Sequence, residues 1–396
     1  MAKFAIISRK LVALKHPMSI FTIPNIRIAG MAAAVPIKEV SNLDYRWITM
    51  KERNQLVKMI GVEKRRIAEK GQTTSDLCFA AVSRLLDNLG WDRSEIQLLI
   101  MVSQSTDYII PATAPILQDR MGLPKTCLAF DINLGCSGFV YGLSVIGSMM
   151  SQAGFKKAIL LAGDLSNVTS SYRDKSTYPL FGDAGTATAL ELDPSAAPVH
   201  FNLQTDGSGY DAIIIQDGGV RNLVSKKSFD YKKYGEGIYR SRLHISLNGI
   251  EVFNFSLREV VPNIKATLEY AGRTLDDYDY LVFHQANRLI NETLRKMLKV
   301  EKEKVPYSIH KYGNTSSASI PLTIISELRE EVTVKKVRFL LSAFGIGLSW
   351  GTVLLETDRI VCPGILEVGS QQSAVGSQQS AVSSQQSAVN SQPNNQ

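Results

Sequence analysis

Cys136 lies between two segments of different character. The apolar run 126–132 predicts a buried strand, and the small and aliphatic residues that follow Cys136 predict a buried helix. A thiol in the first turn of a helix feels the unpaired backbone N–H groups and the positive end of the helix dipole, which favour the thiolate. Most free cysteines, however, simply pack in protein cores. The local sequence therefore leaves two interpretations open, a nucleophile and a core residue.

Two polar residues far along the chain occupy comparable positions. His284 directly follows the apolar run 280–283, and Asn314 lies in a run of small polar residues, 312–321, that precedes an expected helix at 322–329. A single histidine at a strand end is usually structural, and small polar residues commonly open a helix. Neither residue identifies a site on its own.

Together, the thiol, the imidazole and the amide suit one reaction. Cys136 takes an acyl group from a thioester. Neutral His284 and the Asn314 amide supply uncharged hydrogen-bond donors to the oxygen of an enolate formed from a second thioester, and such donors are worth about 3–4 kcal/mol each. If the enolate forms by loss of CO₂, no strong base is needed. The backbone N–H groups of Cys136 and of Ile346, in the turn 345–347, are candidates for the oxyanion hole of the tetrahedral intermediate.

The elements that must position these residues alternate between helix and strand. Helices are expected at 74–89, 114–121 and 137–153, and strands at 98–102, 127–132 and 158–162. A helical stretch is also expected over 43–60, followed at 61–66 by a turn that carries three bases. This alternation predicts an α/β fold in which a mixed sheet is covered on both faces.

The order of motifs in the first part of the chain returns in the second part. The run 280–285 resembles 100–104, and 344–354 resembles 181–191. These echoes predict two similar halves, residues 25–195 and 196–358, with a site at the seam between them. Residues 1–24 are predicted to be an N-terminal extension. Residues 368–396 are predicted to be a disordered, low-complexity tail. Their seven-residue repeats of mostly Ser, Gln, Ala and Val have too few apolar residues to form the buried contact surface of a coiled coil.

The composition suits an enzyme. The 396-residue chain has a formal charge of +7, and its Lys and Arg residues are scattered, so nucleic-acid binding is not expected. The apolar patches of the first 24 residues are too short for a signal or a membrane span, so no membrane association is expected. The four cysteines show neither metal spacing nor a disulfide framework, which predicts a cytoplasmic protein without a metal site.

Four motifs occur in a fixed order along the chain. They are Gly135-Cys136-Ser137-Gly138-Phe139, His284-Gln285-Ala286-Asn287, Gly313-Asn314-Thr315-Ser316 and Phe344-Gly345-Ile346-Gly347. This set resembles the β-ketoacyl-acyl-carrier-protein synthase III family of the thiolase-like superfamily, over roughly residues 25–358. The resemblance implies a five-layered αβαβα fold built from two similar halves, a homodimer, and a triad carried here by Cys136, His284 and Asn314.

The resemblance also implies a reaction. An acyl group passes from a thioester primer to Cys136, and a decarboxylative Claisen condensation with malonyl-acyl carrier protein follows, in fatty acid or related biosynthesis. No cofactor is expected beyond the acyl-CoA or acyl-carrier-protein thioesters that serve as substrates. Asn287, Arg288, Arg295 and Lys296 are expected to meet the substrate or the acidic carrier protein, although many such basic runs are only solvated faces.

The chain departs from the family pattern at three places. Where members that use acyl-CoA hold its adenine with a Trp and an Arg, this chain has Gln55 and Met59, so a carrier protein is a plausible primer donor. The family's usual arginine stands two residues past Asn287, whereas Arg288 stands one residue past it. Ile346 replaces a commonly small residue, and its bulk is expected to narrow the pocket.

Two rival functions remain open from the sequence. A thiolase-fold acyltransferase or specialised-metabolite condensing enzyme would keep Cys136 and use another acceptor. A non-catalytic partner of a carrier protein would leave Cys136 inert and use the repeat tail for binding.

Overall fold

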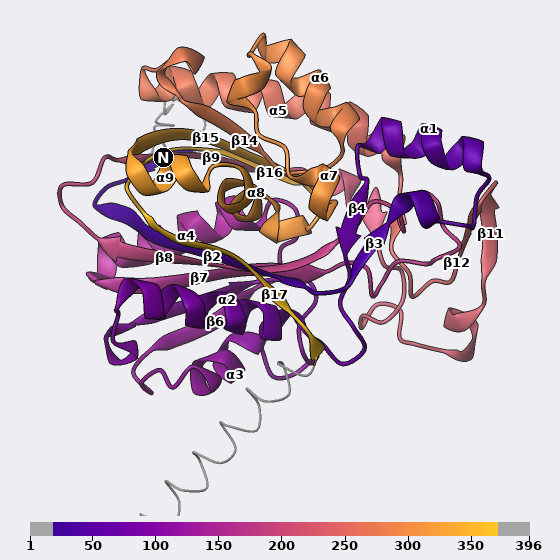
Figure 1. Ribbon diagram of the computed structural model, residues 1–396, viewed down its shortest axis with the longest axis horizontal. Helices are drawn as coiled ribbons and strands as arrows, with labels where there is room; N and C mark the ends of the chain where they lie inside the picture. The colour runs from indigo at the N-terminus through magenta and orange to yellow at the C-terminus, as the bar shows by residue number, and fades with distance from the viewer. Residues whose placement is uncertain (1–18, 371–396) are drawn as a thin grey trace, which may run out of the picture.

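The computed structural model describes residues 19–370. The expectations for 1–18 and for 371–396, which are most of the predicted extension and tail, lie outside the described residues. Within 19–370 the chain forms two large mixed sheets and several helices (Figure 1). In this part of the chain, no helix is both long and apolar enough to cross a membrane.

The first sheet has the strand order β17-β2-β8-β7-β5-β6. The bounds of these strands are Val361–Val368, Ile26–Pro36, Asp183–Leu192, Lys157–Leu165, Leu98–Val102 and Leu128–Ile132. Strand β5 is parallel to β6 and β7, and β8 is antiparallel to β7 and β2. Every residue of β5 is buried, as expected for a central strand covered on both faces.

The second sheet has the order β1-β9-β16-β15-β14. Its strands span Ile20–Ile23, Val199–Thr205, Ser349–Asp358, Lys336–Gly345 and Tyr280–Phe283. Strand β14 is parallel to β15, which is antiparallel to β16. The same pattern joins β5, β7 and β8 in the first sheet. The echoes between 100–104 and 280–285, and between 181–191 and 344–354, therefore mark corresponding places in the two sheets.

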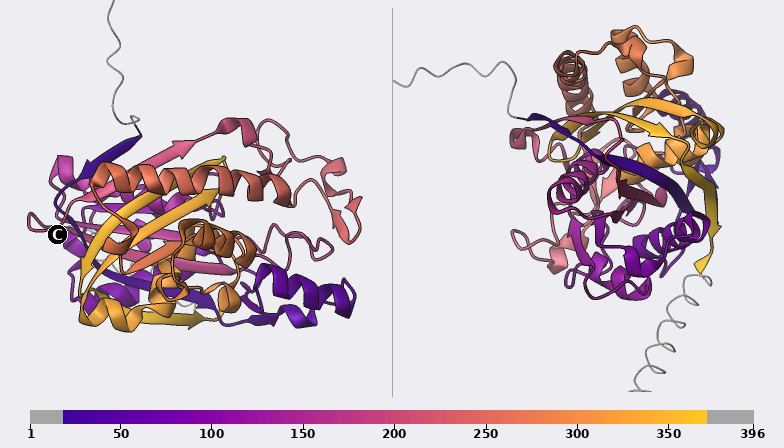
Figure 2. Two further views of the ribbon diagram at one scale, coloured as in Figure 1. Left: turned by 90° about the horizontal axis from the view of Figure 1, so that it is seen from above. Right: turned by 90° about the vertical axis from the view of Figure 1, so that its left-hand side faces the viewer.

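Helices fill three layers around the two sheets (Figures 1 and 2). α2 (Thr74–Leu89) and α3 (Thr113–Arg120) cover the outer face of the first sheet. α4 (Gly138–Ala153) and α8 (Ser319–Glu327) lie between the sheets, and α5 (Gly249–Ala271) and α6 (Arg288–Leu298) lie beyond the second sheet. The predicted five-layered αβαβα fold is confirmed.

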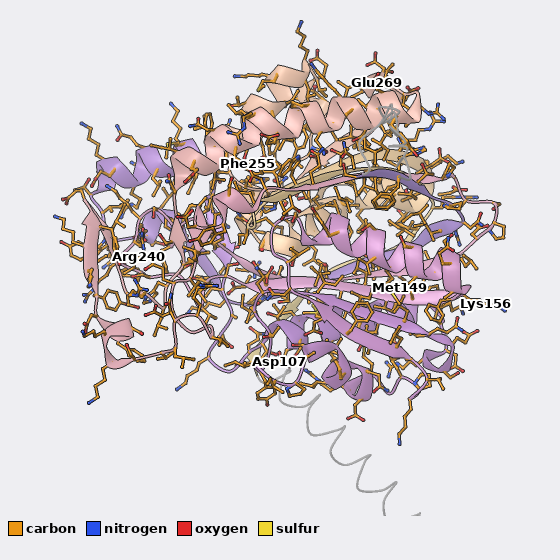
Figure 3. The ribbon with its side chains drawn as sticks, turned by 180° about the vertical axis from the view of Figure 1, so that it is seen from behind. Asp107, Met149, Lys156, Arg240, Phe255 and Glu269 are labelled. Carbon is orange, nitrogen blue, oxygen red and sulfur yellow. The ribbon has the colours of Figure 1, made fainter. Side chains whose placement is uncertain are left out.

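The central layer is apolar because its helices touch a sheet on each side. Phe139, Leu143 and Ile146 of α4 and Ile320 of α8 are all at most 2% exposed and belong to one core cluster with both sheets. A second core cluster lies under α5, where Phe255 packs (Figure 3). Burial of such side chains stabilises the fold by roughly 1.5–3 kcal/mol each.

A smaller lobe extends from one side of the layers (Figure 1). It includes α1 (Met50–Ile60) and the hairpin of β11 (Lys232–Gly235) and β12 (Ile238–Arg240). Further short elements are β3 (Glu39–Ser41) paired with β4 (Lys64–Arg66), β10 (Ile213–Ile214) paired with β13 (Ser246–Leu247), α7 (Ile309–Tyr312) and α9 (Arg329–Val334).

The predicted start of the first half and the predicted end of the second half were both wrong. Residues 20–23 are not part of an extension, because β1 pairs with β9 at the edge of the second sheet. Residues 361–368 lie past the predicted end of the second half, yet β17 pairs in parallel with β2 of the first sheet. Each end of the described chain thus completes the sheet of the opposite half.

Local expectations also needed correction. Over 43–60 the chain is helical in α1 only after Thr49, whose side chain forms a capping box with Glu52. The expected turn at 61–66 ends in strand β4, where Arg65 is fully buried and donates to Asn42 Oδ1 at 3.0 Å and the Phe181 carbonyl at 2.9 Å. The helix expected at 322–329 begins earlier, at Ser319, since Pro321 is tolerated in a first helical turn.

We expect β17 to contribute measurably to stability. A chain that ends at Ile360 loses the buried side chains of Cys362 and Val368, and Arg329 loses the Cys362 carbonyl that it contacts at 3.0 Å. Two buried side chains at roughly 1.5–3 kcal/mol each predict a melting temperature about 10 °C lower. The control chain ends at Ser370 and keeps β17. Equal melting temperatures of the two chains, measured by calorimetry, would show that β17 is dispensable.

Candidate active site

Cys136 lies in the loop between β6 and α4, as the sequence predicted. Helix α4 begins at Gly138 with Ser137 as its N-cap, so Cys136 precedes the helix instead of lying in its first turn. The side chain is 6% exposed and lies against the glycine turn 345–347, because a Cβ added to Gly345 would lie 2.8 Å from its sulfur. The turn that carries Ile346, whose N–H is proposed for the oxyanion hole, is therefore next to the nucleophile.

Burial dominates the electrostatics of this thiol. Loss of solvent raises the pKa of Cys136 to about 11, although hydrogen bonds from Ile346 and Ser316 lower it. The expected preference for a thiolate is thus not met at rest, because the desolvation cost of the anion exceeds the help of nearby N–H groups. At neutral pH the residue is a thiol that must lose a proton to react.

His284 lies directly after β14, on the opposite sheet from Cys136, and is 1% exposed. Its backbone N–H donates to the Ser342 carbonyl at 2.8 Å, and its Nδ1 lies 2.7 Å from Ser319 Oγ. Burial lowers the pKa of His284 to about 3, so the ring is neutral at physiological pH. If the Ser319 hydroxyl donates to Nδ1, the ring proton is on Nε2, which makes that nitrogen a donor.

Asn314 lies where the two halves touch. It forms a parallel bridge with Phe181, and its carbonyl accepts from the Gly182 N–H at 3.0 Å. The Asn314 side-chain oxygen accepts from the Ser316 N–H at 2.9 Å, which orients the amide. Its NH₂ group donates to the Ala286 carbonyl at 3.4 Å and carries a second N–H that can donate to a substrate.

Glycines allow this close approach. A Cβ placed on Gly182 would lie 1.9 Å from the Tyr312 carbonyl oxygen, and one on Gly345 would lie 2.5 Å from Cys136 Cβ and 2.8 Å from its sulfur. No side chain fits at either place. Glycine is therefore required at 182 and at 345, where the backbone of one half meets the other.

The three residues line one cavity of about 600 Å³. Its walls come from both halves and include Phe344, Val252, Ile290 and Ile245. Ile346 also lines the cavity, where a smaller residue would leave more room. A cavity of this size with mainly apolar walls and a few convergent polar groups is typical of a small-molecule site.

The predicted substrate-binding and carrier-binding residues fall into three groups. Asn287 lines the cavity and caps α6 by accepting from the Ile290 N–H at 2.9 Å. Arg288 and Lys296 are exposed. Arg295 is instead paired with Glu292 at 3.0 Å and donates to the Val300 carbonyl at 2.7 Å, so its charge is largely compensated.

Gln55 and Met59, which stand where a CoA adenine clamp is expected, are both exposed on α1. Neither lines the cavity. The positions offer no aromatic face or guanidinium for stacking on an adenine ring.

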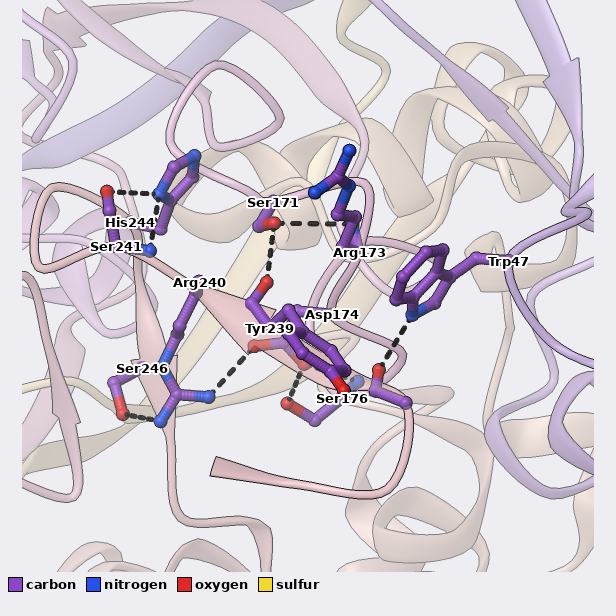
Figure 4. A network of polar contacts seen from close by, with 11 residues as sticks. Trp47, Ser171, Arg173, Asp174, Ser176, Tyr239, Arg240, Ser241, His244 and Ser246 are labelled. Atoms are coloured by element: carbon purple, nitrogen blue, oxygen red, sulfur yellow. Dashed lines mark hydrogen bonds and ion pairs between the residues drawn. The ribbon is translucent and has the colours of Figure 1, made fainter. Parts of the chain in front are cut away.

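A polar network supports the cavity wall on the side of the lobe (Figure 4). Asp174 is fully buried and accepts from Arg240 at 2.9 Å, and Arg240 also donates to Ser246 Oγ at 2.7 Å. The Ser171 hydroxyl donates to the Tyr239 carbonyl at 2.8 Å. These contacts tie the loop after β7 to the β11–β12 hairpin and to the segment before α5, and the latter borders the cavity through Ile245 and Leu247.

Comparison with known proteins identifies the family. Residues 130–207 match the model of the 3-oxoacyl-[acyl-carrier-protein (ACP)] synthase III domain, and residues 268–357 match that of its C-terminal domain. The chain is 31% identical over 333 residues to the beta-ketoacyl-[acyl-carrier-protein] synthase III of Geobacillus kaustophilus, with 84% of this chain and 99% of the relative aligned. It belongs to the synthase III family.

Other relatives agree. The synthase III of Rhodopirellula baltica is 33% identical, with 84% of this chain and 98% of the relative aligned. The crystal structure of a 3-oxoacyl-(acyl-carrier protein) synthase from Burkholderia xenovorans is similar with a TM-score of 0.83 and 37% identity, covering 88% of this chain and 99% of that one. The resemblance drawn from the four motifs is therefore confirmed, and the chain is a condensing enzyme of the acyltransferase type.

Sequence reasoning missed several polar residues of the synthase site. Ser316 and Ser319 lie in the run of small polar residues that was assigned only to a helix start. Asp164, at the end of β7, lines the cavity and is 2% exposed. An acidic residue that closes the apolar run of a buried strand was the available signal, since such a residue must find partners.

We expect His284 to remain neutral across the physiological pH range. Because burial lowers its pKa to about 3, its ring gains a proton only well below pH 5, whereas an unfolded histidine does so near pH 6.5. Folding is therefore disfavoured by this residue as the pH falls from 6.5 toward 3.

The measurement is ¹⁵N NMR of protein labelled at its five histidines, with His284→Gln to assign the signal. We expect the His284 nitrogen shifts to stay constant from pH 8 to pH 5. A midpoint between pH 6 and 7 for that signal would contradict the buried, neutral ring.

Proposed function

We propose that this enzyme transfers an acyl group from a thioester primer to Cys136 and then condenses it with malonyl-acyl carrier protein to give a β-ketoacyl thioester. The observation that carries the proposal is the convergence of Cys136, His284 and Asn314, from both halves of the chain, on one largely apolar cavity. The names of the relatives, which are synthases of this kind, support the same assignment.

The first half-reaction uses the sulfur of Cys136. It bonds to the acyl carbon of the primer, the donor's carbon–sulfur bond breaks, and a free thiol leaves. Negative charge on the carbonyl oxygen is stabilised by the backbone N–H groups of Cys136 and Ile346. The cavity walls shield the resulting thioester from water.

The second half-reaction uses His284 and Asn314. The malonyl thioester loses CO₂, and the electron pair left behind forms an enolate whose oxygen accepts hydrogen bonds from His284 Nε2 and the Asn314 amide. The enolate carbon then attacks the acyl carbon, and the bond to Cys136 breaks. Neutral donors suit this step, because an imidazolium would be costly in so buried a place.

The partner that brings the substrates is an acyl carrier protein. The residues that line the cavity include Asn287, at the N-cap of α6, and the exposed Gly218 and Gly219, which lie in the segment that leads to β11. Basic side chains are exposed on both sides: Arg288 and Lys296 on α6, and Arg221, Lys226, Lys227, Lys232 and Lys233 in the lobe. An acidic carrier protein is complementary to such a surface.

We further propose that the enzyme is a homodimer joined at β6. This strand is the outer strand of the first sheet and is bonded along one edge to β5. Beside it, Ile109 and Ile110 are 94% and 85% exposed. An unpaired strand edge next to exposed apolar residues is typical of a surface that a second copy covers.

Substitutions of the triad should separate the two half-reactions. Cys136→Ala should show no acyl mass increase with any acyl thioester. His284→Ala and Asn314→Ala should still gain the acyl mass on Cys136, yet decarboxylate malonyl-acyl carrier protein at least about 100-fold more slowly, since each donor is worth about 3–4 kcal/mol. Intact-protein mass spectrometry and CO₂ release measure the two steps. An acylated enzyme that passes its acyl group to water or to a non-malonyl acceptor would instead support the rival acyltransferase.

Charge reversal at the mouth should weaken carrier-protein use selectively. Arg288→Glu with Lys296→Glu should raise the KM for the malonyl-acyl carrier protein about 10-fold and reduce its dependence on salt. The same variant should react normally with malonyl-N-acetylcysteamine, which has no protein surface. The matched control reverses Lys70 and Arg84, exposed residues near and on α2, on the far side of the first sheet. Equal KM values for the two double variants would exclude α6 as a docking surface.

A further inference from the structure

The Asn314 amide depends on a short segment of the first half, residues 180–182. The Asn314 N–H donates to the Leu180 carbonyl at 2.9 Å, and its carbonyl accepts from the Gly182 N–H at 3.0 Å. This is the pairing of one residue in a parallel ladder, with Phe181 opposite Asn314. The segment ends just before β8 begins, so it lies outside the first sheet. The position of the Asn314 side chain is therefore set by the position of 180–182.

Arg65 anchors that segment. Its Nη1 donates to the Phe181 carbonyl at 2.9 Å, and its Nε donates to Asn42 Oδ1 at 3.0 Å. The Asn42 amide in turn donates to the Pro179 carbonyl at 2.6 Å. The two side chains thus hold the backbone carbonyls on either side of Leu180.

Arg65 also contacts the chain on the other side of this pairing. A Cβ added to Gly313 would lie 3.2 Å from Arg65 Cγ and 2.8 Å from the Leu180 carbonyl oxygen. Arg65 is on β4, which lies beside α7, the helix that ends directly before Gly313 (Figure 1). The stem of Arg65 therefore packs against the chain that leads into Asn314, while its guanidinium holds the chain opposite.

The chemistry of the guanidinium suits this position. Arg65 is fully buried, and its Cζ lies 4.6 Å from the centre of the Tyr178 ring. Two of its N–H groups donate from one rigid plane, a geometry that the single nitrogen of a lysine on its flexible stem does not reproduce. Within the residues that the structure describes, the cavity is lined by neither Arg65 nor Asn42. Any effect of Arg65 on the reaction therefore passes through the segments that it holds.

We propose that Arg65 is a positioning residue for the condensation step. It fixes the pairing of 180–182 with Asn314, and thereby places the Asn314 amide where the oxygen of the enolate forms. The inference rests on the proposed function, because the enolate belongs to the second half-reaction. Cys136 and the turn 345–347, which serve the first half-reaction, lie before α4 and between β15 and β16. A displaced Asn314 should therefore slow decarboxylation more than acylation.

The test replaces Arg65 by lysine. Arg65→Lys keeps a cation and most of the stem but loses the planar pair of donors. Arg66→Lys is the matched control, because Arg66 follows on the same strand, is partly exposed and donates instead to the Ile37 carbonyl at 3.0 Å. Calorimetry establishes that each variant is folded.

Two rates are compared for each enzyme. Acylation of Cys136 by butyryl-N-acetylcysteamine is followed by quenched-flow mass spectrometry, and CO₂ release from malonyl-acyl carrier protein gives kcat and KM. We expect Arg65→Lys to lower kcat for CO₂ release about 10-fold, because a displaced donor stabilises the transition state less, and to lower it about 5-fold more than the acylation rate. Arg66→Lys should keep kcat within about 2-fold of the wild type. Equal proportional losses in the two rates, or a change in KM alone, would overturn the positioning role.

A double-substitution cycle shows whether Arg65 acts through Asn314. In the Asn314→Ala background the amide is absent, so adding Arg65→Lys should slow CO₂ release by less than about 2-fold. A further loss of about 10-fold would show that Arg65 supports the whole site, and would overturn the inference. Asn314→Ala combined with His284→Ala should be slower than Asn314→Ala alone, which shows that a further loss is detectable.

Asn42→Ala keeps the inference testable if Arg65→Lys does not fold. It removes both the acceptor of Arg65 Nε and the donor to the Pro179 carbonyl, and it leaves Arg65 in place. CO₂ release should again fall, by about 3-fold or more, and this loss should disappear in the Asn314→Ala background. A loss that persists in that background would contradict the inference.

The outcomes are separable from those of the proposed function. A wild-type enzyme that no acyl thioester labels, or that releases no CO₂ from malonyl-acyl carrier protein, would refute the proposed function itself. A wild-type enzyme active in both half-reactions, with equal proportional losses in Arg65→Lys, would refute only the role of Arg65.

Discussion

The close approach of two backbones at the seam between the halves is the constraint on which the site depends. Gly182 and Gly345 lie where a single added carbon would collide with the opposite chain. Because the halves meet so tightly, Asn314 of one half forms a bridge to Phe181 of the other, and the backbone at Gly345 lies against Cys136. The first half supplies Cys136 and the second half supplies His284 and Asn314, so the site forms only where the two halves meet.

Burial then decides the charge of Cys136 and of His284. The thiol is protonated and the imidazole is neutral because the two sheets and the central helices exclude water from both. Such an environment suits a reaction whose charge appears only briefly, on a tetrahedral oxygen and on an enolate. It also explains why the carboxylate of Asp164 needs so many donors and why Arg65, deeper under the cavity wall, lies over the Tyr178 ring at 4.6 Å.

The sequence predicted the parts of this structure that depend on local patterns. Apolar runs located β5 and β6, helical spacing located α2 and α4, and the junctions between them located Cys136 and His284. What it missed depends on distant pairing. The four-residue run 20–23 reads as a fragment of an extension until β9 supplies its partner, and the bases of 61–66 read as a turn until Arg65 is seen buried against Phe181.

The same limit applies to the site. Cys136, His284 and Asn314 were found because their residue types and motifs are distinctive. Ser316, Ser319 and Asp164 are common residues whose importance comes from what lies opposite them after folding. The expectation of a resting thiolate failed for a related reason. The helix start is local and visible in the sequence, whereas the burial that raises the pKa of Cys136 appears only after folding.

Strands β1 and β17 each pair in the sheet of the opposite half, and this arrangement affects how the chain folds during synthesis. Strand β17 pairs Val361 with Gly30, so the first sheet of the nascent chain keeps an open edge along β2 until nearly the whole chain has left the ribosome. Strand β1, at the other end, waits for β9 and is likewise unpaired while the first half emerges. Neither half is complete as a separate folding unit, and contacts of such long range form slowly. The two end strands therefore pair late in folding. A chain that stops before β17 does not leave an independently folded half; it exposes the unpaired edge of β2, which is prone to aggregation.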